Sequence, residues 1–200
     1  GIPAEPLFRS RILSALEFTD DNLAEIEKML SHGKCVAVGE IGLEYHYDFV
    51  PKDVQIAAFE KHLQLAVKHD VPVIVHDREA HADTMDLLKK YRPKGVLHCY
   101  SGSAEMAKEV LKMGMYIGLG GAVTFKNAVK PVEVAQMIPL DRLLLETDCP
   151  YMAPVPMRGK RNNSAYIEFV AEKIASVRGI SAQELLDITA DNTRKLFDIK

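Results

Sequence analysis

The sequence predicts an α/β fold built on a parallel sheet, and three observations support this prediction. Short apolar runs recur along the chain, and segments with helical spacing separate them. The connections between them are short, which is typical of βαβ units in which all strands point the same way. The runs that predict strands are residues 35–45, 71–79, 94–102, 115–121 and 142–151. Four of them end in a side chain that can bind a metal, namely Glu40, His76, His98 and Asp148.

The segments between the strands have the spacing of amphipathic helices. In the longest of them, Val54, Ala58 and Leu65 recur at roughly helical intervals. Ser103 is a suitable N-cap for a further helix, and Gly114 is a suitable stop. The predicted helices are 19–30, 52–69, 80–91, 103–113, 128–137, 164–178, 181–186 and 191–197.

Two architectures suit this alternation, a doubly wound sheet and a (β/α)8 barrel. No GxGxxG or GxxxxGK[ST] loop follows a strand, which disfavours the nucleotide-binding wound sheets. Ligand-type residues at successive strand ends favour the TIM-barrel-type fold, although only about five of its eight strands are evident. Residues 1–18 offer no clear sixth strand. We expect a single domain over residues 1–200, in which residues 1–34 form an atypical N-terminal segment and helix.

Bulk composition limits the class of protein. A chain of 200 residues with 48% hydrophobic content can bury a substantial core, and a net charge of −3 gives no global attraction to nucleic acid. The three cysteines are widely spaced and form no CxxC pair, so we expect neither a disulfide framework nor a cysteine zinc site. The longest apolar runs have the length of a strand. We therefore expect a soluble, cytoplasmic protein without a membrane span.

The four ligand-type residues predict a metal site. Because the C-terminal ends of parallel strands share one rim, Glu40, His76, His98 and Asp148 should converge there. Carboxylate and imidazole ligands suit Mg²⁺, Mn²⁺, Fe²⁺ or Zn²⁺. Each residue has a structural alternative, since an acid can bond a helix N-terminus and a buried histidine can donate to a carbonyl. Four such residues at successive strand ends favour a metal-dependent hydrolase.

A basic loop follows the last of these residues. Arg158, Lys160 and Arg161 lie close together in a glycine-containing stretch, and guanidinium groups bind phosphate in bidentate fashion. Such a cluster is often only solvated surface, but its position just after Asp148 favours a phosphate clamp. His46 lies just beyond the first strand on the expected rim, where it is a candidate substrate contact.

Six segments together resemble the TatD family of metal-dependent deoxyribonucleases. They are GEIGLEYH, VIVHDREA, GVLHCYSG, YIGLGGAVTF, LLLETDCPYMAP and RGKRN, and the resemblance extends from about Cys35 to Phe197. It implies a TIM-barrel hydrolase that cleaves phosphodiester bonds in DNA with two divalent ions (Mg²⁺, Mn²⁺ or Zn²⁺). By this resemblance Glu40 bridges the two ions, and His76 and His98 bind the second. Asp148 binds the first ion and orients or deprotonates the attacking water.

The resemblance also implies a nucleic-acid partner. Arg78 and Glu79, in the HDRE segment, correspond to rim residues that position substrate. The expected partner is DNA bound through its phosphate backbone, with RNA left open. Backbone contacts of this kind predict salt-sensitive binding rather than base readout.

The sequence departs from the family pattern at three places. Glu44 stands where GEIGLD is usual, and RGKRN continues with Asn163-Ser164 rather than Glu-Pro. No HxH pair, which the family carries on its first strand, occurs in these 200 residues. We therefore expect weak metal binding, with one ion rather than two, and impaired or absent turnover by this chain alone. Self-association or a complementary N-terminal segment would then cover the open barrel edges. The alternatives are an amidohydrolase acting on a small molecule and a catalytically incomplete remnant that serves in assembly or binding.

Overall fold

The computed structural model describes residues 19–199. The chain divides into two compact units, one ending at Val96 and the other beginning at Leu97. The expectation that residues 1–18 add no strand falls outside the described residues, and the expectation of a single domain stays a prediction. Among residues 19–199, no helix is both long enough and apolar enough to cross a membrane.

The first unit is built on two adjacent parallel strands. Strand β1 pairs with β2 from Val38 opposite Val73 to Glu44 opposite Arg78, and the register shifts between Gly39 and Ile41. The elements in chain order are α1 (Asp20–Leu30), β1 (Val38–Glu44), α2 (Lys52–Lys68), β2 (Val73–Arg78) and α3 (His81–Tyr91), and the boundary between the units falls within β3 (Gly95–Leu97). This pairing places the side chains of β1 next to those of β2, where the site described below is formed.

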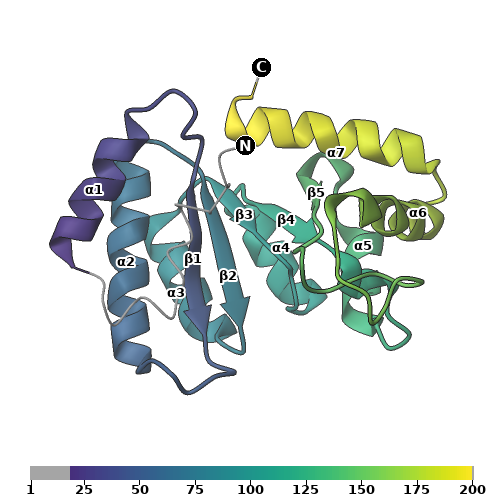
Figure 1. Ribbon diagram of the computed structural model, residues 1–200, viewed down its shortest axis with the longest axis horizontal. Coiled ribbons are helices and arrows are strands. Elements are labelled where there is room, and N and C mark those ends of the chain that lie inside the picture. The colour runs from purple at the N-terminus through teal and green to yellow at the C-terminus, as the bar shows by residue number, and fades with distance from the viewer. Residues whose placement is uncertain (1–18, 200) are drawn as a thin grey trace. The chain divides into compact units, whose positions relative to one another are not determined.

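Helix α2 covers β1 with its apolar face. Phe59, Leu63 and Ala66, spaced three and four residues apart, are almost completely buried. In Figure 1, α1 lies beside α2. Its first turn is closed by a capping box in which the Thr19 hydroxyl accepts from the Asn22 backbone N–H and the Asn22 side chain accepts from the backbone of Thr19. Helix packing of this kind holds β1 from one side and fixes where its polar residues lie.

The second unit contains the remaining strands and helices. Strands β4 and β5 are parallel and pair over three positions, from Ile117 opposite Leu143 to Leu119 opposite Leu145. The elements are α4 (Ala104–Lys112), β4 (Tyr116–Leu119), η2 (Gly121–Thr124), α5 (Val129–Met137), η3 (Leu140–Arg142), β5 (Leu143–Leu145), η4 (Ser164–Tyr166), α6 (Ile167–Arg178) and α7 (Ala182–Phe197). Helices α6 and α7 pack against each other. Ile117, Leu143 and Ile174 are fully buried and form part of the core of this unit.

The strand order confirms the predicted α/β class. The five strands within residues 19–199 are hydrogen-bonded in the order in which they occur in the chain, β1-β2-β3-β4-β5. A sequential parallel order is that of a TIM barrel, whereas a doubly wound sheet reverses its order at a switch point. The strands of this sheet thus follow one another in the order found in a TIM barrel.

One prediction of secondary structure was wrong at the C-terminus. A single helix, α7, replaces the two short helices expected at 181–186 and 191–197. Thr189 has a lower helix propensity than its neighbours, but its hydroxyl donates to the Leu185 carbonyl and its side chain is buried. The Asn192 amide donates to the carbonyls of Leu140 and Leu143. These tertiary contacts outweigh the weak local propensity and keep the helix continuous.

Candidate metal centre

Glu40 and His76 face each other across the first strand pair. The carboxylate Oε1 of Glu40 lies 3.0 Å from Nδ1 of His76, and both side chains are about three-quarters buried. Contrary to the sequence prediction, these residues do not end their strands, because β1 continues to Glu44 and β2 to Arg78. The register shift between Gly39 and Ile41 falls at Glu40, and this irregularity is where its carboxylate meets His76.

Gly42 allows the two strands to approach each other beside His76. A Cβ at this position would lie 2.0 Å from the backbone oxygen of His76, and the φ angle of +138° is one that other residues rarely adopt. Gly42 therefore has a structural role, because it lets β1 approach β2 at His76.

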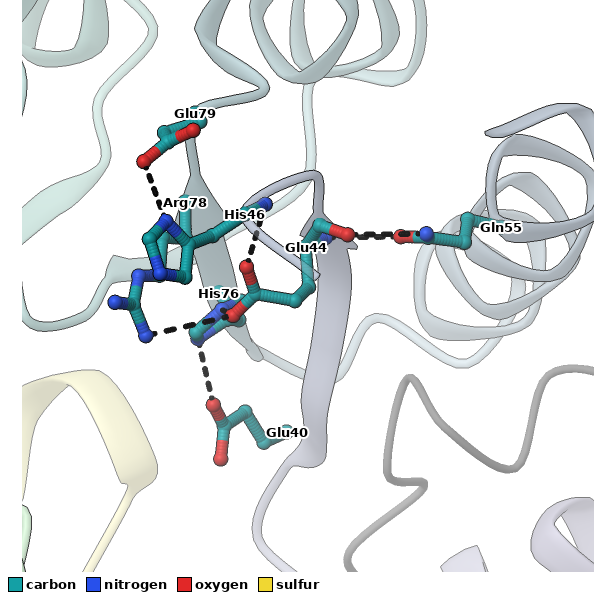
Figure 2. A network of polar contacts seen from close by, with 7 residues as sticks. All are labelled: Glu40, Glu44, His46, Gln55, His76, Arg78 and Glu79. Carbon is teal, nitrogen blue, oxygen red and sulfur yellow. Dashed lines mark hydrogen bonds and ion pairs between the residues drawn. The ribbon is translucent and has the colours of Figure 1, made fainter. Parts of the chain in front are cut away.

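Glu44 is a site residue to which the sequence analysis gave no role. Its Oε2 lies 3.2 Å from Nε2 of His76, so the imidazole stands between two carboxylates, those of Glu40 and Glu44 (Figure 2). The side chain of Glu44 is only 12% exposed. The spacing of four residues between Glu40 and Glu44 could have indicated a shared face, because alternate strand residues point the same way.

Glu44 is itself firmly held by its surroundings. Its backbone N–H donates to the Gln55 side chain, and the Gln55 amide donates back to its carbonyl. Its second carboxylate oxygen accepts the backbone N–H of His46 at 2.9 Å. Figure 2 shows these bonds around the end of β1. The carboxylate that contacts His76 is thus positioned before any ligand arrives.

Arg78 and Glu79, the two predicted substrate residues, lie at the border of this network. The Arg78 guanidinium lies 3.9 Å from Glu44, a distance at which the interaction is weak, and the arginine side chain is 46% exposed. Glu79 contacts His46 at 2.7 Å, and both side chains are exposed. The structure brings Arg78 and His46 close to the metal-type ligands, and their substrate contacts stay predictions.

In the second unit, His98 follows β3 directly and contacts Glu146. Its Nδ1 lies 3.6 Å from Oε1 of Glu146, and the same oxygen accepts the backbone N–H of Cys99 at 2.6 Å. A Cβ on Gly118 would come within 2.6 Å of the Glu146 carboxylate. Glu146 is a second residue that sequence reasoning missed. A carboxylate beside a ligating histidine commonly fixes its ring orientation.

Asp148 lies three residues beyond β5, in backbone geometry that is unusual for a non-glycine residue. Its φ is 52°, in the left-handed region. The buried amide of Asn162 donates to the carbonyls of Thr147 and Tyr151, at 2.6 Å each, and the Tyr151 N–H donates to the Asp148 carbonyl. These bonds attach the basic loop to the segment that carries Asp148, as its position in the sequence suggested.

The three basic residues of this loop are all exposed. Arg158 is partly engaged, because its guanidinium lies 4.1 Å from the ring centre of Phe125 and donates weakly to the Ala153 carbonyl. The Lys160 ammonium lies 3.8 Å from the sulfur of Met157. The phosphate clamp of Arg158, Lys160 and Arg161 stays a prediction.

The donor set fits a divalent ion. In the first unit a carboxylate and an imidazole approach within 3.0 Å, and the second carboxylate holds the other ring nitrogen. Whichever nitrogen of His76 binds an ion, the opposite nitrogen keeps a carboxylate partner that fixes the tautomer. Oxygen and imidazole donors without thiolate suit Mg²⁺, Mn²⁺ or Zn²⁺.

Known proteins of several bacteria are similar to this chain. A metal-dependent hydrolase of Bacillus subtilis, YabD, is 45% identical over 190 residues, covering 94% of this chain and 74% of the relative. Another from Escherichia coli, YcfH, is 41% identical, covering 89% of the chain and 68% of the relative. A protein of Erwinia tasmaniensis named 3'-5' ssDNA/RNA exonuclease TatD is 34% identical, covering 92% of the chain and 74% of the relative.

Solved structures show the same fold. The TatD homologue YJJV of E. coli superposes with a TM-score of 0.86 at 33% identity, covering 94% of this chain and 74% of that one. A TatD family hydrolase of Entamoeba histolytica superposes with a TM-score of 0.78 at 26% identity, covering 93% of this chain and 72% of that one.

Fold and relatives together define a metal-dependent hydrolase with a TIM-barrel-like fold. The sequence profile of the family described as "TatD related DNase" matches residues 12–198. The chain belongs to the TatD family, which confirms the resemblance seen in its motifs.

Proposed function

We propose that this chain is a nuclease that hydrolyses phosphodiester bonds in DNA, with RNA as a further substrate, through water activated at a divalent metal ion. The observation that carries the proposal is His76, whose two ring nitrogens lie 3.0 and 3.2 Å from the carboxylates of Glu40 and Glu44. Support for the substrate comes from relatives in Erwinia and Rahnella named 3'-5' ssDNA/RNA exonuclease TatD, at 34% and 39% identity.

In this proposal Glu40, His76 and His98 hold the ion. Each offers one ligand atom, two nitrogens and one oxygen, which leaves further positions for water and a phosphate oxygen. A divalent ion bound there would lower the pKa of a water molecule and offset the charge that develops on phosphate oxygens. Mg²⁺, Mn²⁺ and Zn²⁺ all suit these donors.

The remaining acidic residues orient groups and move a proton. Glu44 accepts from the His76 ring and keeps it in one orientation, as Glu146 does for His98. Asp148 is proposed to orient the attacking water and accept its proton. As a carboxylate that follows β5, Asp148 can serve as a general base only if it is ionised and close to that water.

The basic residues are proposed to hold the phosphate. Arg78 is half exposed beside the Glu44–His76 pair, and Glu79 positions His46 at the same border. Arg158, Lys160 and Arg161 are exposed on the loop that Asn162 fastens next to Asp148. Guanidinium groups match two phosphate oxygens at once, so arginine is better suited to this role than lysine.

The proposal is tested by degradation of end-labelled single-stranded DNA by the 200-residue chain. Mg²⁺, Mn²⁺ and Zn²⁺ are supplied in turn, and EDTA and Asp148→Asn serve as controls. We expect the label to be lost only when a metal is supplied, and to be retained both in EDTA and with Asp148→Asn. Intact DNA at every protein concentration, from chain shown to be folded by circular dichroism, would contradict it and favour the non-catalytic alternative.

A triple variant separates a nuclease from a small-molecule hydrolase. Replacing Arg158, Lys160 and Arg161 by glutamine should abolish cleavage of DNA while metal binding persists, because a phosphate substrate needs these charges. Unchanged DNA cleavage by that variant would show that the loop is no phosphate clamp. Hydrolysis of a neutral ester together with inert DNA would favour the amidohydrolase alternative.

A further inference from the structure

The loop between β1 and α2 carries two exposed aromatic rings. Tyr47 is 45% exposed and Phe49 is 65% exposed. Their rings are stacked, with centroids 5.4 Å apart and planes only 7° from parallel. Exposed aromatic residues that form a patch commonly mark a binding surface. We call this pair the aromatic platform.

The platform rests on a fixed loop. Gln55 closes the loop by donating to the carbonyls of Glu44 and Val50, while Val50 itself is buried. Before the platform, the Tyr45 hydroxyl donates to Asp83 at 2.6 Å, and burial together with that carboxylate raises the pKa of Tyr45. Val50 is thus buried and its carbonyl is hydrogen-bonded, whereas the side chains of Tyr47 and Phe49 in the same loop are exposed to solvent. Because the loop backbone is held on both sides of the rings, little backbone entropy is lost when they bind a flat partner.

The platform adjoins the metal-type ligands of the same unit. The Arg78 guanidinium lies 5.3 Å from the Tyr47 ring centre and 3.9 Å from the Glu44 carboxylate, which contacts His76. His46 stands edge-on to Tyr47, with centroids 4.8 Å apart. Figure 2 shows Arg78 and His46 beside the Glu44–His76 pair. A cation thus lies between the exposed rings and the ligands.

We propose that Tyr47 and Phe49 form a stacking platform for an unpaired base of a single-stranded nucleic acid. Every base has a flat π face that can stack on aromatic side chains, and phosphates follow at regular spacing along the strand. With a base on the platform, Arg78, whose guanidinium lies 5.3 Å from the Tyr47 ring centre, is placed to receive an adjoining phosphate. Bases in a duplex are already stacked on their neighbours, so the platform selects single strands over duplexes.

This inference rests on the proposed nuclease function, and it adds the residues that recognise the bases of a single strand. Stacking tolerates any sequence, because no base edge is read. Removing one ring should therefore weaken binding of every base by a similar factor. A strand that lacks bases but keeps its phosphates should not use the platform at all.

The test compares two labelled 12-mers, oligo(dA) and an abasic strand of the same length and charge, by fluorescence anisotropy in EDTA. The native chain should bind oligo(dA) about tenfold more tightly than the abasic strand. Tyr47→Ala and Phe49→Ala should bring the two Kd values together, and Phe49→Trp should keep them apart. Val67→Ala, which removes an exposed apolar side chain from α2, is the matched control and should behave like the native chain.

Equal binding of both strands by the native chain would overturn the inference, as would an equal loss for both strands in Phe49→Ala. A native dimer that Phe49→Ala converts to monomer in sedimentation would show that a second copy occupies the platform, and would also overturn it. Cleavage of oligo(dA) with added Mn²⁺ reports separately on the nuclease function. Base-dependent binding without any cleavage would leave the platform standing and remove the nuclease proposal.

Discussion

At the scale of single residues, the proposed metal ligand His76 is held in place by two neighbouring carboxylates. A carboxylate faces each ring nitrogen, Glu40 at Nδ1 and Glu44 at Nε2. These contacts hold the imidazole in place, and if an ion were bound one of them would serve as the orienting partner. The ring therefore needs little rearrangement to bind a metal.

Glu44→Ala should weaken metal binding by about 10- to 100-fold, because His76 would lose the carboxylate at its second ring nitrogen. Titration calorimetry with Mn²⁺ or Zn²⁺ measures the change. Glu44→Asp, which keeps the charge, is the control and should retain most of the affinity. If Glu44→Ala bound the metal with the same Kd as the native chain, Glu44 would not orient His76.

His62 provides a pH-dependent contribution to stability away from the metal site. It is 2% exposed on α2, its Nδ1 bonds the Ala58 carbonyl, and burial lowers its pKa below 6.5. The unfolded chain therefore binds a proton more readily than the folded chain does. Stability from this group is complete above the unfolded pKa and falls as pH decreases toward the lower, folded pKa.

His62→Gln should therefore flatten the decrease in Tm between pH 7.5 and 5.5. Its absolute Tm can differ from that of the native chain, so the slope against pH is the quantity to compare. His32→Gln, at an exposed position, should keep the native slope. Identical slopes in His62→Gln and the native chain would refute this assignment.

At the scale of elements, the pairing of β1 with β2 decides whether the site forms. The sequence indicated both strands and their order, because apolar runs are strong local signals. It misplaced Glu40 and His76 at strand ends, because strand ends are set by pairing and a local register shift rather than by composition. Glu44 and Glu146 were missed for a related reason, since each becomes significant only through a histidine distant in sequence.

Gly42→Ala should destabilise the chain by about 3 kcal/mol, because the new methyl would meet the His76 backbone and strain a positive φ. Chemical unfolding measures the free energy of unfolding. Gly33→Ala is the matched control, since a Cβ there has nothing within 4 Å and should change stability little. A loss below about 0.5 kcal/mol in Gly42→Ala would show that the strands can move apart freely.

At the scale of the whole molecule, the motifs predicted the class of protein better than they predicted the details of its site. Sequential strand order, the family and the hydrolase class follow from local patterns, and the structure and relatives confirm them. The number of ions, the role of Asp148 and the clamp on the basic loop depend on ligands and substrate, so they remain proposals. The aromatic platform could not be predicted, because Tyr47 and Phe49 look like core residues until their exposure is known.

The most direct test of the metal centre is anomalous diffraction at the zinc edge, from crystals of the 200-residue chain grown with Zn²⁺. Our account predicts a strong peak bounded by the Glu40 carboxylate and the imidazoles of His76 and His98. No peak at these residues, with zinc ordered elsewhere on the chain, would contradict the proposed centre.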